Sequence, residues 1–462
     1  MRRAILIAAL AAAGCTSLQP PYVRPAAPVP PSWPVGDAYL RQTEAALPAV
    51  SYRDIFGDPR LQALIGQALA NNRDLRVAAA NVAAARAQYR VQRAARLPTV
   101  EAGAGIGVGD RGAGGIVDDY SVDVGLSAFE IDLFGRVRSL SDAALQSFFA
   151  QEAAARATRL SLVAELANAY LTLAADRELL RIAQATEANA ARSVEITGAR
   201  YRGGIAPRID LRQAETVLEQ ARSDVAAQQA LAAQDVNALR LLAGAEIDPA
   251  LLPTGLDGVD GQLRELPAGL SSEILLRRPD VVEAEYELRA SNARIGAARA
   301  AFFPRISLTS VLGLASAGLS GLFSGDAFTF SVAPSARLPI FDGGANRGNL
   351  QLARAQFDAA LAGYERTIQA AFRDVADALA RRGTIDRQIA AEQRRLTAAR
   401  DTYQLTDARY RGGIDNFLAT LDAQRELYAA EQSLARTRLE RARNLVELYR
   451  SLGGDALAGL PE

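Results

Sequence analysis

The thiol of Cys15 is the side chain whose type and position point most directly to a specific chemistry. It is the single cysteine of 462 residues, and it follows Arg2, Arg3, an apolar run over residues 4–13, and Gly14. This order is typical of a secretory signal and its cleavage point. Because the cysteine comes directly after that point, the segment resembles a lipobox, whose thiol becomes acylated. We therefore expect residues 1–14 to be a signal peptide and Cys15 to carry lipid such as palmitate. The alternative is an ordinary signal peptide with a cysteine nearby.

The remaining composition excludes most catalytic and metal-binding chemistry. The sequence has no His, all 52 of its basic residues are Arg, and 52 acidic residues balance them. Without His, Lys or a second Cys, a His general base, a Schiff-base lysine and a zinc or copper ligand set are all impossible. Charge balance also removes the basic surplus expected of a nucleic-acid binder. We therefore expect no enzyme activity, no cofactor, no metal and no nucleic-acid partner.

The chain that follows the cysteine divides into an extended arm and two copies of one unit. Seven prolines between residues 19 and 34 favour polyproline II, so residues 15–56 are predicted to form a lipidated N-terminal arm. Residues 199–205 and 408–414 are the same heptapeptide, Ala-Arg-Tyr-Arg-Gly-Gly-Ile. This duplication predicts a first repeat over 57–265 and a second over 266–456, with a short tail over 457–462.

Each repeat is predicted to contain a helix, two strands and then two long helices. Helical composition covers about 58–95 and 269–301. Alternating apolar residues predict strands at about 100–109 and 119–128, and at about 305–313 and 327–336. Residues 136–197 contain neither Gly nor Pro and predict one continuous helix, whereas Gly363 and Gly383 are expected to interrupt its counterpart. Returning helices are expected at about 207–243 and 415–451.

Strands of about ten residues have the length of tilted membrane strands. Four strands cannot close a barrel, and an open strand edge is not tolerated in lipid, so several chains must pool their strands. The very long helices must pack side by side as coiled coils. The alternative is a soluble coiled-coil protein with two small β-hairpins.

Several motifs together resemble the TolC family of outer-membrane factors, of the lipoprotein (NodT-like) type. They are Asp58-Pro59-Arg60-Leu61, Asn71–Leu75, Phe129–Arg136, Arg277-Arg278-Pro279-Asp280, Ala301–Pro304, Pro339–Gly344 and Leu448–Gly454. The resemblance implies an α+β membrane protein that forms a homotrimer. In such a trimer a 12-stranded β-barrel in the bacterial outer membrane continues as a long antiparallel α-helical coiled-coil barrel in the periplasm.

The resemblance also implies function and partners. It implies a passive exit duct for drugs or other small molecules in a tripartite efflux system. The expected partners are a periplasmic membrane-fusion adaptor, an inner-membrane pump of the resistance-nodulation-division type, and outer-membrane lipid. The alternative is the outer-membrane channel of a type I protein secretion system.

The same resemblance assigns roles to residues of the two Tyr-Arg-Gly-Gly-Ile turns and of the helices beyond them. It implies that the turns contact the adaptor through Tyr201, Gly203, Gly204, Ile205, Tyr410, Gly412, Gly413 and Ile414. It implies a periplasmic gate at Asp210, Tyr410 and Asp422. Asp415 stands where the best-known member has arginine, and Ala419 replaces an acidic residue, so Arg208 or Arg411 would have to serve a gate ion pair. Alternatively, the paired glycines only end helices.

Overall fold

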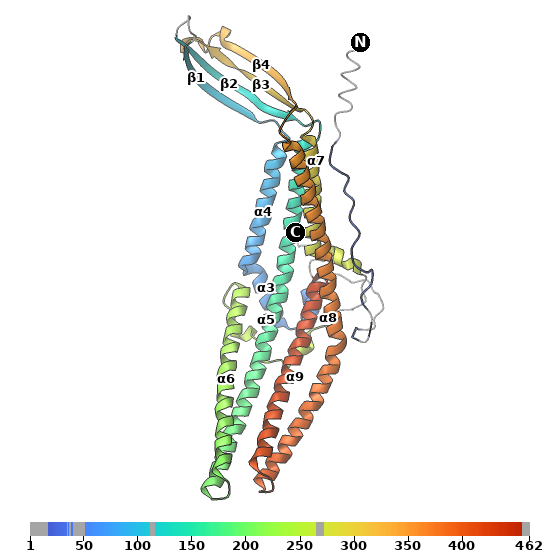
Figure 1. Cartoon of the computed structure of the whole chain (residues 1–462). Coiled ribbons are helices and arrows are strands. Elements are labelled where there is room, and N and C mark those ends of the chain that lie inside the picture. Colours follow the sequence, from blue (N-terminus) through green and yellow to red (C-terminus); the bar gives the residue numbers. More distant parts are fainter. Residues whose placement is uncertain are drawn as a thin grey trace. The chain divides into compact units, whose positions relative to one another are not determined.

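The computed structural model describes residues 17–34, 36, 38–39, 51–110, 116–264 and 272–454 (Figure 1). The predicted signal peptide, Cys15 and the predicted tail lie outside these residues. The chain divides into two compact units. The first unit comprises residues 1–27, 79–153 and 282–367, and the second comprises residues 28–78, 154–281 and 368–462.

The first unit contains one antiparallel sheet with the strand order β1-β2-β3-β4. The strands are β1 (Val100–Asp110), β2 (Ile116–Ile131), β3 (Arg305–Ser316) and β4 (Phe328–Arg337). All four predicted strands are confirmed, and the β2·β3 ladder joins the hairpins of the two repeats. Apolar and polar side chains alternate along the strands, so the sheet has one apolar and one polar face.

Strand β2 runs past its predicted end because of a bulge. The ladder between β2 and β3 shifts register between Leu126 and Phe129, and Ala128 has a φ of 44°. One extra residue in a bulge re-aims the side chains that follow it. After the bulge, Glu130 pairs with Ser307 and therefore lies on the polar face of the sheet.

The described helices are long. They are α2 (Tyr52–Ile55), α3 (Pro59–Asn71), α4 (Arg73–Ala94), α5 (Arg136–Arg202), α6 (Arg208–Ala243), α7 (Pro279–Ala300), α8 (Ala345–Arg411) and α9 (Phe417–Ser451). Helix α5 is continuous over 67 residues, as predicted, and α6 and α9 are the expected returning helices. No described helix is both long and apolar enough to cross a membrane.

Three helix predictions were wrong in detail. The stretch 58–95 breaks at Asn72, whose side-chain oxygen accepts hydrogen bonds from the N–H groups of Asp74 (2.8 Å) and Leu75 (3.2 Å) and so caps α4. The stretch 269–301 becomes α-helical only at Pro279, after a 3₁₀ turn over Ser272–Arg277.

The third error concerns the glycines of α8, which runs through Gly363 and Gly383 without interruption. A glycine costs a helix only about 1 kcal/mol, which a helix of 67 residues tolerates. At Gly383 the reason for glycine is a close approach, because a Cβ there would collide with the carbonyl oxygen of Ala38. The arm and α8 therefore fit together only without a side chain at this position.

The proline-rich arm lies along the protein in both units. In the first unit, Glu285 of α7 is only 4% exposed and accepts hydrogen bonds from Arg24 of the arm and from Arg289. Burial alone would raise the pKa of Glu285, but these two guanidinium groups hold it below its usual value. In the second unit, Trp33 stacks on Phe372 with ring centroids 4.9 Å apart.

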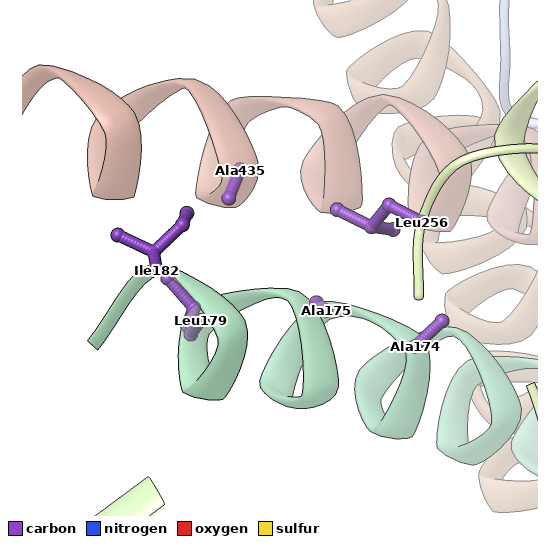
Figure 2. Packing of buried hydrophobic residues seen from close by; sticks show 6 residues of the cluster. All are labelled: Ala174, Ala175, Leu179, Ile182, Leu256 and Ala435. Atoms are coloured by element: carbon purple, nitrogen blue, oxygen red, sulfur yellow. The ribbon is translucent and has the colours of Figure 1, made fainter. Parts of the chain in front are cut away.

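Alanine allows close packing of helices in the second unit. Figure 2 shows Ala435 of α9 and Leu256 facing Ala174, Ala175, Leu179 and Ile182 of α5. Small side chains at such contacts let two backbones approach while still excluding water. This packing holds the helices that end in the two turns.

Candidate functional site: the two helix tips

Two helix–turn–helix tips in the second unit contain the residues assigned to adaptor contact and gating. We define the first tip as residues 197–214, between α5 and α6, and the second tip as residues 406–423, between α8 and α9. In both, the repeated Gly-Gly pair ends the long helix and the chain turns back (Figure 1).

The backbone of the two turns is the same. Gly204 has a φ of 68° and Gly413 a φ of 72°, in the left-handed region that favours glycine. The N–H of Ile205 donates to the carbonyl of Arg200 (2.8 Å), and that of Ile414 donates to the carbonyl of Arg409 (2.9 Å). Both turns are Schellman motifs. The identical heptapeptides therefore encode identical helix ends.

The side chains of the two tips are placed differently. Tyr201 of the first tip is 42% exposed, whereas Tyr410 of the second tip is 5% exposed. Tyr410 packs with Phe417, Leu421 and Ala214, and its ring centroid lies 5.3 Å from that of Phe417. Tyr410 thus joins an apolar cluster between the tips.

Arg200 connects the two tips. Its Nη1 donates to the carbonyl oxygen of Tyr410 at 2.6 Å, and its guanidinium carbon lies 4.6 Å from the centre of the Tyr410 ring. The hydroxyl groups of Tyr410 and the buried Thr197 are 3.3 Å apart, within hydrogen-bond distance. A cation at the C-terminal end of α8 also interacts favourably with the helix dipole. Arg200, Thr197 and Tyr410 together form what we call the tip bridge.

A sequence difference just after the heptapeptides explains why Arg200 contacts the other tip and Arg409 does not. Arg409, the counterpart of Arg200, donates two hydrogen bonds to Asp415 of its own tip, at 2.6 and 3.0 Å. The counterpart of Asp415 in the first tip is Ala206, which offers no carboxylate. Arg200 therefore remains available for the neighbouring tip.

A second difference decides which tyrosine is covered. Phe417 is 2% exposed and lies against Tyr410, whereas its counterpart in the first tip is the charged Arg208. An arginine keeps its head group in water and leaves the neighbouring ring open. Hence Tyr201 stays exposed while Tyr410 does not.

The acidic gate candidates lie in different environments. Asp210 is half-buried, and burial raises its pKa, although Arg200 lowers it in part. Asp422 is exposed and lies 3.7 Å from Arg425. Asp415 has a lowered pKa because it accepts hydrogen bonds from Arg409. The structure therefore places Tyr410 in the bridge, Asp210 near Arg200, and Asp422 outside both.

The remaining candidates lie in or beside the two turns. Arg411 pairs with Asp407 at 2.8 Å, and the aliphatic side chains of Ile205 and Ile414 are 71% and 66% exposed. Sequence reasoning missed Arg200, Thr197 and Phe417. The available signal was the mismatch of Ala206 with Asp415 and of Arg208 with Phe417 directly after identical heptapeptides. Among the described residues, no group of three or more acidic side chains is arranged to hold a metal ion.

Comparison with known proteins gives a consistent result. The family described as "Outer membrane efflux protein" matches residues 64–245 and 270–454. The chain is 45% identical, over 97% of its length and 94% of the relative's, to the probable efflux pump outer membrane protein TtgC of Pseudomonas putida. It resembles the crystal structure of a membrane protein from Pseudomonas aeruginosa (TM-score 0.88, 41% identity, covering 95% of this chain and 98% of that one). It also resembles the open state of the MtrE outer membrane channel of Neisseria gonorrhoeae (TM-score 0.84, 38% identity, covering 96% and 99%).

Proposed function

Since this chain belongs to the outer membrane efflux protein family, we propose that it works as a homotrimeric exit duct whose resting state is closed by the tip bridge. The chain is the outer-membrane channel of an efflux system, and the names of its relatives favour efflux over protein secretion. It acts with an adaptor and an inner-membrane pump, for which we propose the resistance-nodulation-division type. The exposed side chains of Tyr201, Ile205 and Ile414 support adaptor contact at the tips, because they offer apolar surface beside the glycine turns.

The two edges of the sheet support the trimer. Strands β1 and β4 are the edge strands, and no described strand pairs with their outer sides. An unpaired strand edge in lipid leaves N–H and C=O groups without partners, at a cost of several kcal/mol each. Pairing of β4 with β1 of a neighbouring copy satisfies both edges.

The duplication predicts the register of that pairing. Within the chain, Val124 of β2 lies opposite Leu312 of β3. Pro98 and Pro304, which precede β1 and β3, set an offset of 206 residues that makes Ile106 the counterpart of Leu312. Because Ile106 pairs with Tyr120 and Leu312 pairs with Phe330, Tyr120 corresponds to Phe330, and Val124, four residues later, corresponds to Pro334. Transferring the internal β2·β3 ladder to the edges places Pro334 opposite Ile106 of the neighbouring copy, and hence Ser335 opposite Gly105.

Cysteine cross-linking tests this register and the trimer together. The pair Ser335→Cys and Gly105→Cys should oxidise to a ladder that ends at three linked copies. The matched control is Ser335→Cys with Gly109→Cys, which lies four residues away, about 13 Å along the strand. Equal cross-linking of both pairs, or a ladder that ends at two copies, would refute the proposal.

The gate proposal rests on the buried position of Tyr410 and its bond to Arg200. Tyr410→Ala keeps the carbonyl that Arg200 binds but removes the ring and the hydroxyl of the tip bridge, so it should loosen the bridge and raise single-channel conductance in planar bilayers. Three copies of Asp422 around one axis should attract cations, so Asp422→Asn should weaken cation preference. If both variants are folded trimers that conduct like the wild type, the constriction lies elsewhere.

The lipid proposal rests on Cys15 and on where the arm begins. The backbone of Ser17 lies close to Gly135, just before α5 and beside the end of β2. Ser17 therefore lies near the end of β2 that leads into α5. Mass spectrometry of the mature N-terminus should find an acylated Cys15, and an unmodified chain that begins elsewhere would contradict this.

A further inference from the structure

A hollow of about 560 Å³ lies in the first unit where the sheet meets its helices. Its walls are the end of β2, the start of β3, the end of β4 and the C-terminal end of α7. Five charged residues line it: Glu130, Asp132, Arg136, Arg305 and Arg337. None of these five residues has a role in the tip bridge, in the proposed strand pairing between copies or in the proposed lipid anchor.

Two of these arginines are forced together by the sheet. Arg305 of β3 and Arg337 of β4 lie directly opposite each other in the ladder, so both side chains leave the same face. Opposed residues in an antiparallel pair have Cβ atoms about 5 Å apart, and like charges there are destabilising. Both side chains are exposed to solvent, which screens part of this repulsion, and negative charge between them would remove the rest.

The carboxylates of the hollow are already engaged. Both oxygens of Glu130 accept hydrogen bonds from Arg136, at 2.8 and 2.6 Å, and Arg305 is 3.5 Å from the same group. Asp132 accepts the backbone N–H of Arg138 at 2.7 Å and so caps α5. Arg337 forms no ion pair with any residue that the structure describes. One side of the hollow thus carries uncompensated positive charge.

Neutral donors lie on the same side. Side chains alternate along a strand, so Ser307 follows Arg305, and Ser335 precedes Arg337, on one face. The hydroxyls of Ser307 and Ser335 are 2.8 Å apart, and Thr309 also lines the hollow. Two guanidinium groups with hydroxyl donors beside them match the several acceptor oxygens of a phosphate.

We propose that this hollow binds a phosphate group between Arg305 and Arg337. Both arginines lie on the polar face of the sheet, which faces the interior of the proposed barrel, so we expect a free phosphate anion there; a phospholipid headgroup is the competing source that the test separates. This site goes beyond the export function, since it needs neither an adaptor nor a pump.

The competing partner of Arg337 is a carboxylate of another copy. If the register proposed above continues along β4 without the bulge of β2, Arg337 lies opposite Gly103 of the neighbouring copy, which has no side chain. Glu101 of that copy lies two residues further along the same face, at a diagonal position that a long side chain can reach. The test therefore has to separate phosphate from Glu101.

The experiment measures phosphate binding to the detergent-extracted trimer by the rise of its thermal unfolding midpoint, at constant ionic strength with chloride as the matched salt. The variants are Arg337→Gln, Arg337→Lys, which keeps the charge but not the forked geometry, and Glu101→Gln. Arg354→Gln is the control, since Arg354 is an exposed arginine of α8 outside the hollow. In a second arm, native mass spectrometry follows retention of phosphatidylglycerol after extraction from nanodiscs with and without it.

We expect inorganic phosphate to stabilise the wild type, Arg354→Gln and Glu101→Gln to the same extent. Arg337→Gln should bind phosphate at least tenfold more weakly, and the affinity of Arg337→Lys should be intermediate. Retention of phosphatidylglycerol that depends on Arg337 would assign the phosphate to lipid, and phosphate binding without lipid retention would assign it to the free anion. The proposal is overturned if neither phosphate source binds the wild type. It is also overturned if Arg337→Gln and Glu101→Gln both dissociate the trimer while phosphate has no effect.

Discussion

The two tips share seven consecutive residues and the same backbone turn, yet Tyr201 is exposed and Tyr410 is buried. The heptapeptide determines how each helix ends, and the residues after it determine what each side chain contacts. Asp415 holds Arg409 within its own tip, whereas Ala206 leaves Arg200 free to cross. Phe417 covers Tyr410, whereas Arg208 leaves Tyr201 open. The two copies have thus diverged: the first tip donates a hydrogen bond from Arg200, and the second tip accepts it at the carbonyl of Tyr410.

The largest effect on amide exchange in the tips is expected when Phe417, whose ring covers Tyr410, is replaced. Phe417→Arg gives the second tip the residue of the first, and loss of a buried Phe costs about 3–5 kcal/mol. Amide hydrogen exchange around Tyr410 should therefore accelerate by at least 100-fold. The reciprocal variant Arg208→Phe should slow exchange around Tyr201. Unchanged exchange in both would show that these residues do not set the difference between the tips.

The next largest effect is expected for Arg200, which reaches from the first tip to the second. Arg200→Gln removes a charged hydrogen bond to the Tyr410 carbonyl, worth about 1.5–3 kcal/mol. Exchange in the second tip should rise by roughly tenfold or more, although the substitution lies in the first tip. Arg202→Gln, at a neighbouring exposed position, is the control and should leave the second tip unchanged. A response confined to the first tip would contradict the bridge.

Swapping the residue after the heptapeptide should have a smaller effect. Ala206→Asp offers Arg200 a carboxylate within its own tip, as Asp415 does for Arg409. Capture of Arg200 should loosen the second tip less than Arg200→Gln does, because exposed ion pairs are weak and compete poorly with a carbonyl bond. The double variant Ala206→Asp with Arg200→Gln should behave like Arg200→Gln alone. An additive loss would indicate that the introduced carboxylate disturbs the turn directly.

The smallest effect is a difference in pH response between the tips. Burial raises the pKa of Asp210, so its ionisation costs stability as pH rises from its usual value of 3.8. Arg409 lowers the pKa of Asp415, so the stability from that pair is present above 3.8 and is lost as pH falls below it. At pH 7, Asp210→Asn should therefore slow exchange in the first tip and Asp415→Asn should speed it in the second. Both effects should shrink as the pH falls below 3.8, and effects of the same sign at pH 7 would contradict these two pKa shifts.

Much of the fold could be predicted from the sequence, because strand and helix periodicities are local. The four strands and the unbroken α5 follow directly from alternation and from the absence of Gly and Pro. The continuity of α8 could not be predicted, since Gly383 is explained by a contact with the distant Ala38. The break at Asn72 could not be predicted from the helical composition of 58–95, because it depends on the Asn72 side chain that caps α4. The bulge within β2, which extends to Ile131, has no recognisable pattern in the sequence.

The site was predictable only in part, because the tips were identified by what they share. The resemblance located Tyr410 and the glycine turns, but the tip bridge depends on Arg200, whose identical copy Arg409 makes a different contact. Contacts between segments 210 residues apart depend on tertiary packing that no local pattern encodes. Comparing the two repeats where they differ would have pointed to Ala206 and Phe417.

In the proposed resting channel, the bridge from Arg200 to Tyr410 keeps the duct closed. The most direct test is single-channel conductance of Arg200→Gln and Arg202→Gln in planar bilayers, with trimer content checked for both. We predict that Arg200→Gln conducts more than the wild type and that Arg202→Gln conducts like it. Equal conductance of all three proteins as intact trimers would contradict the claim.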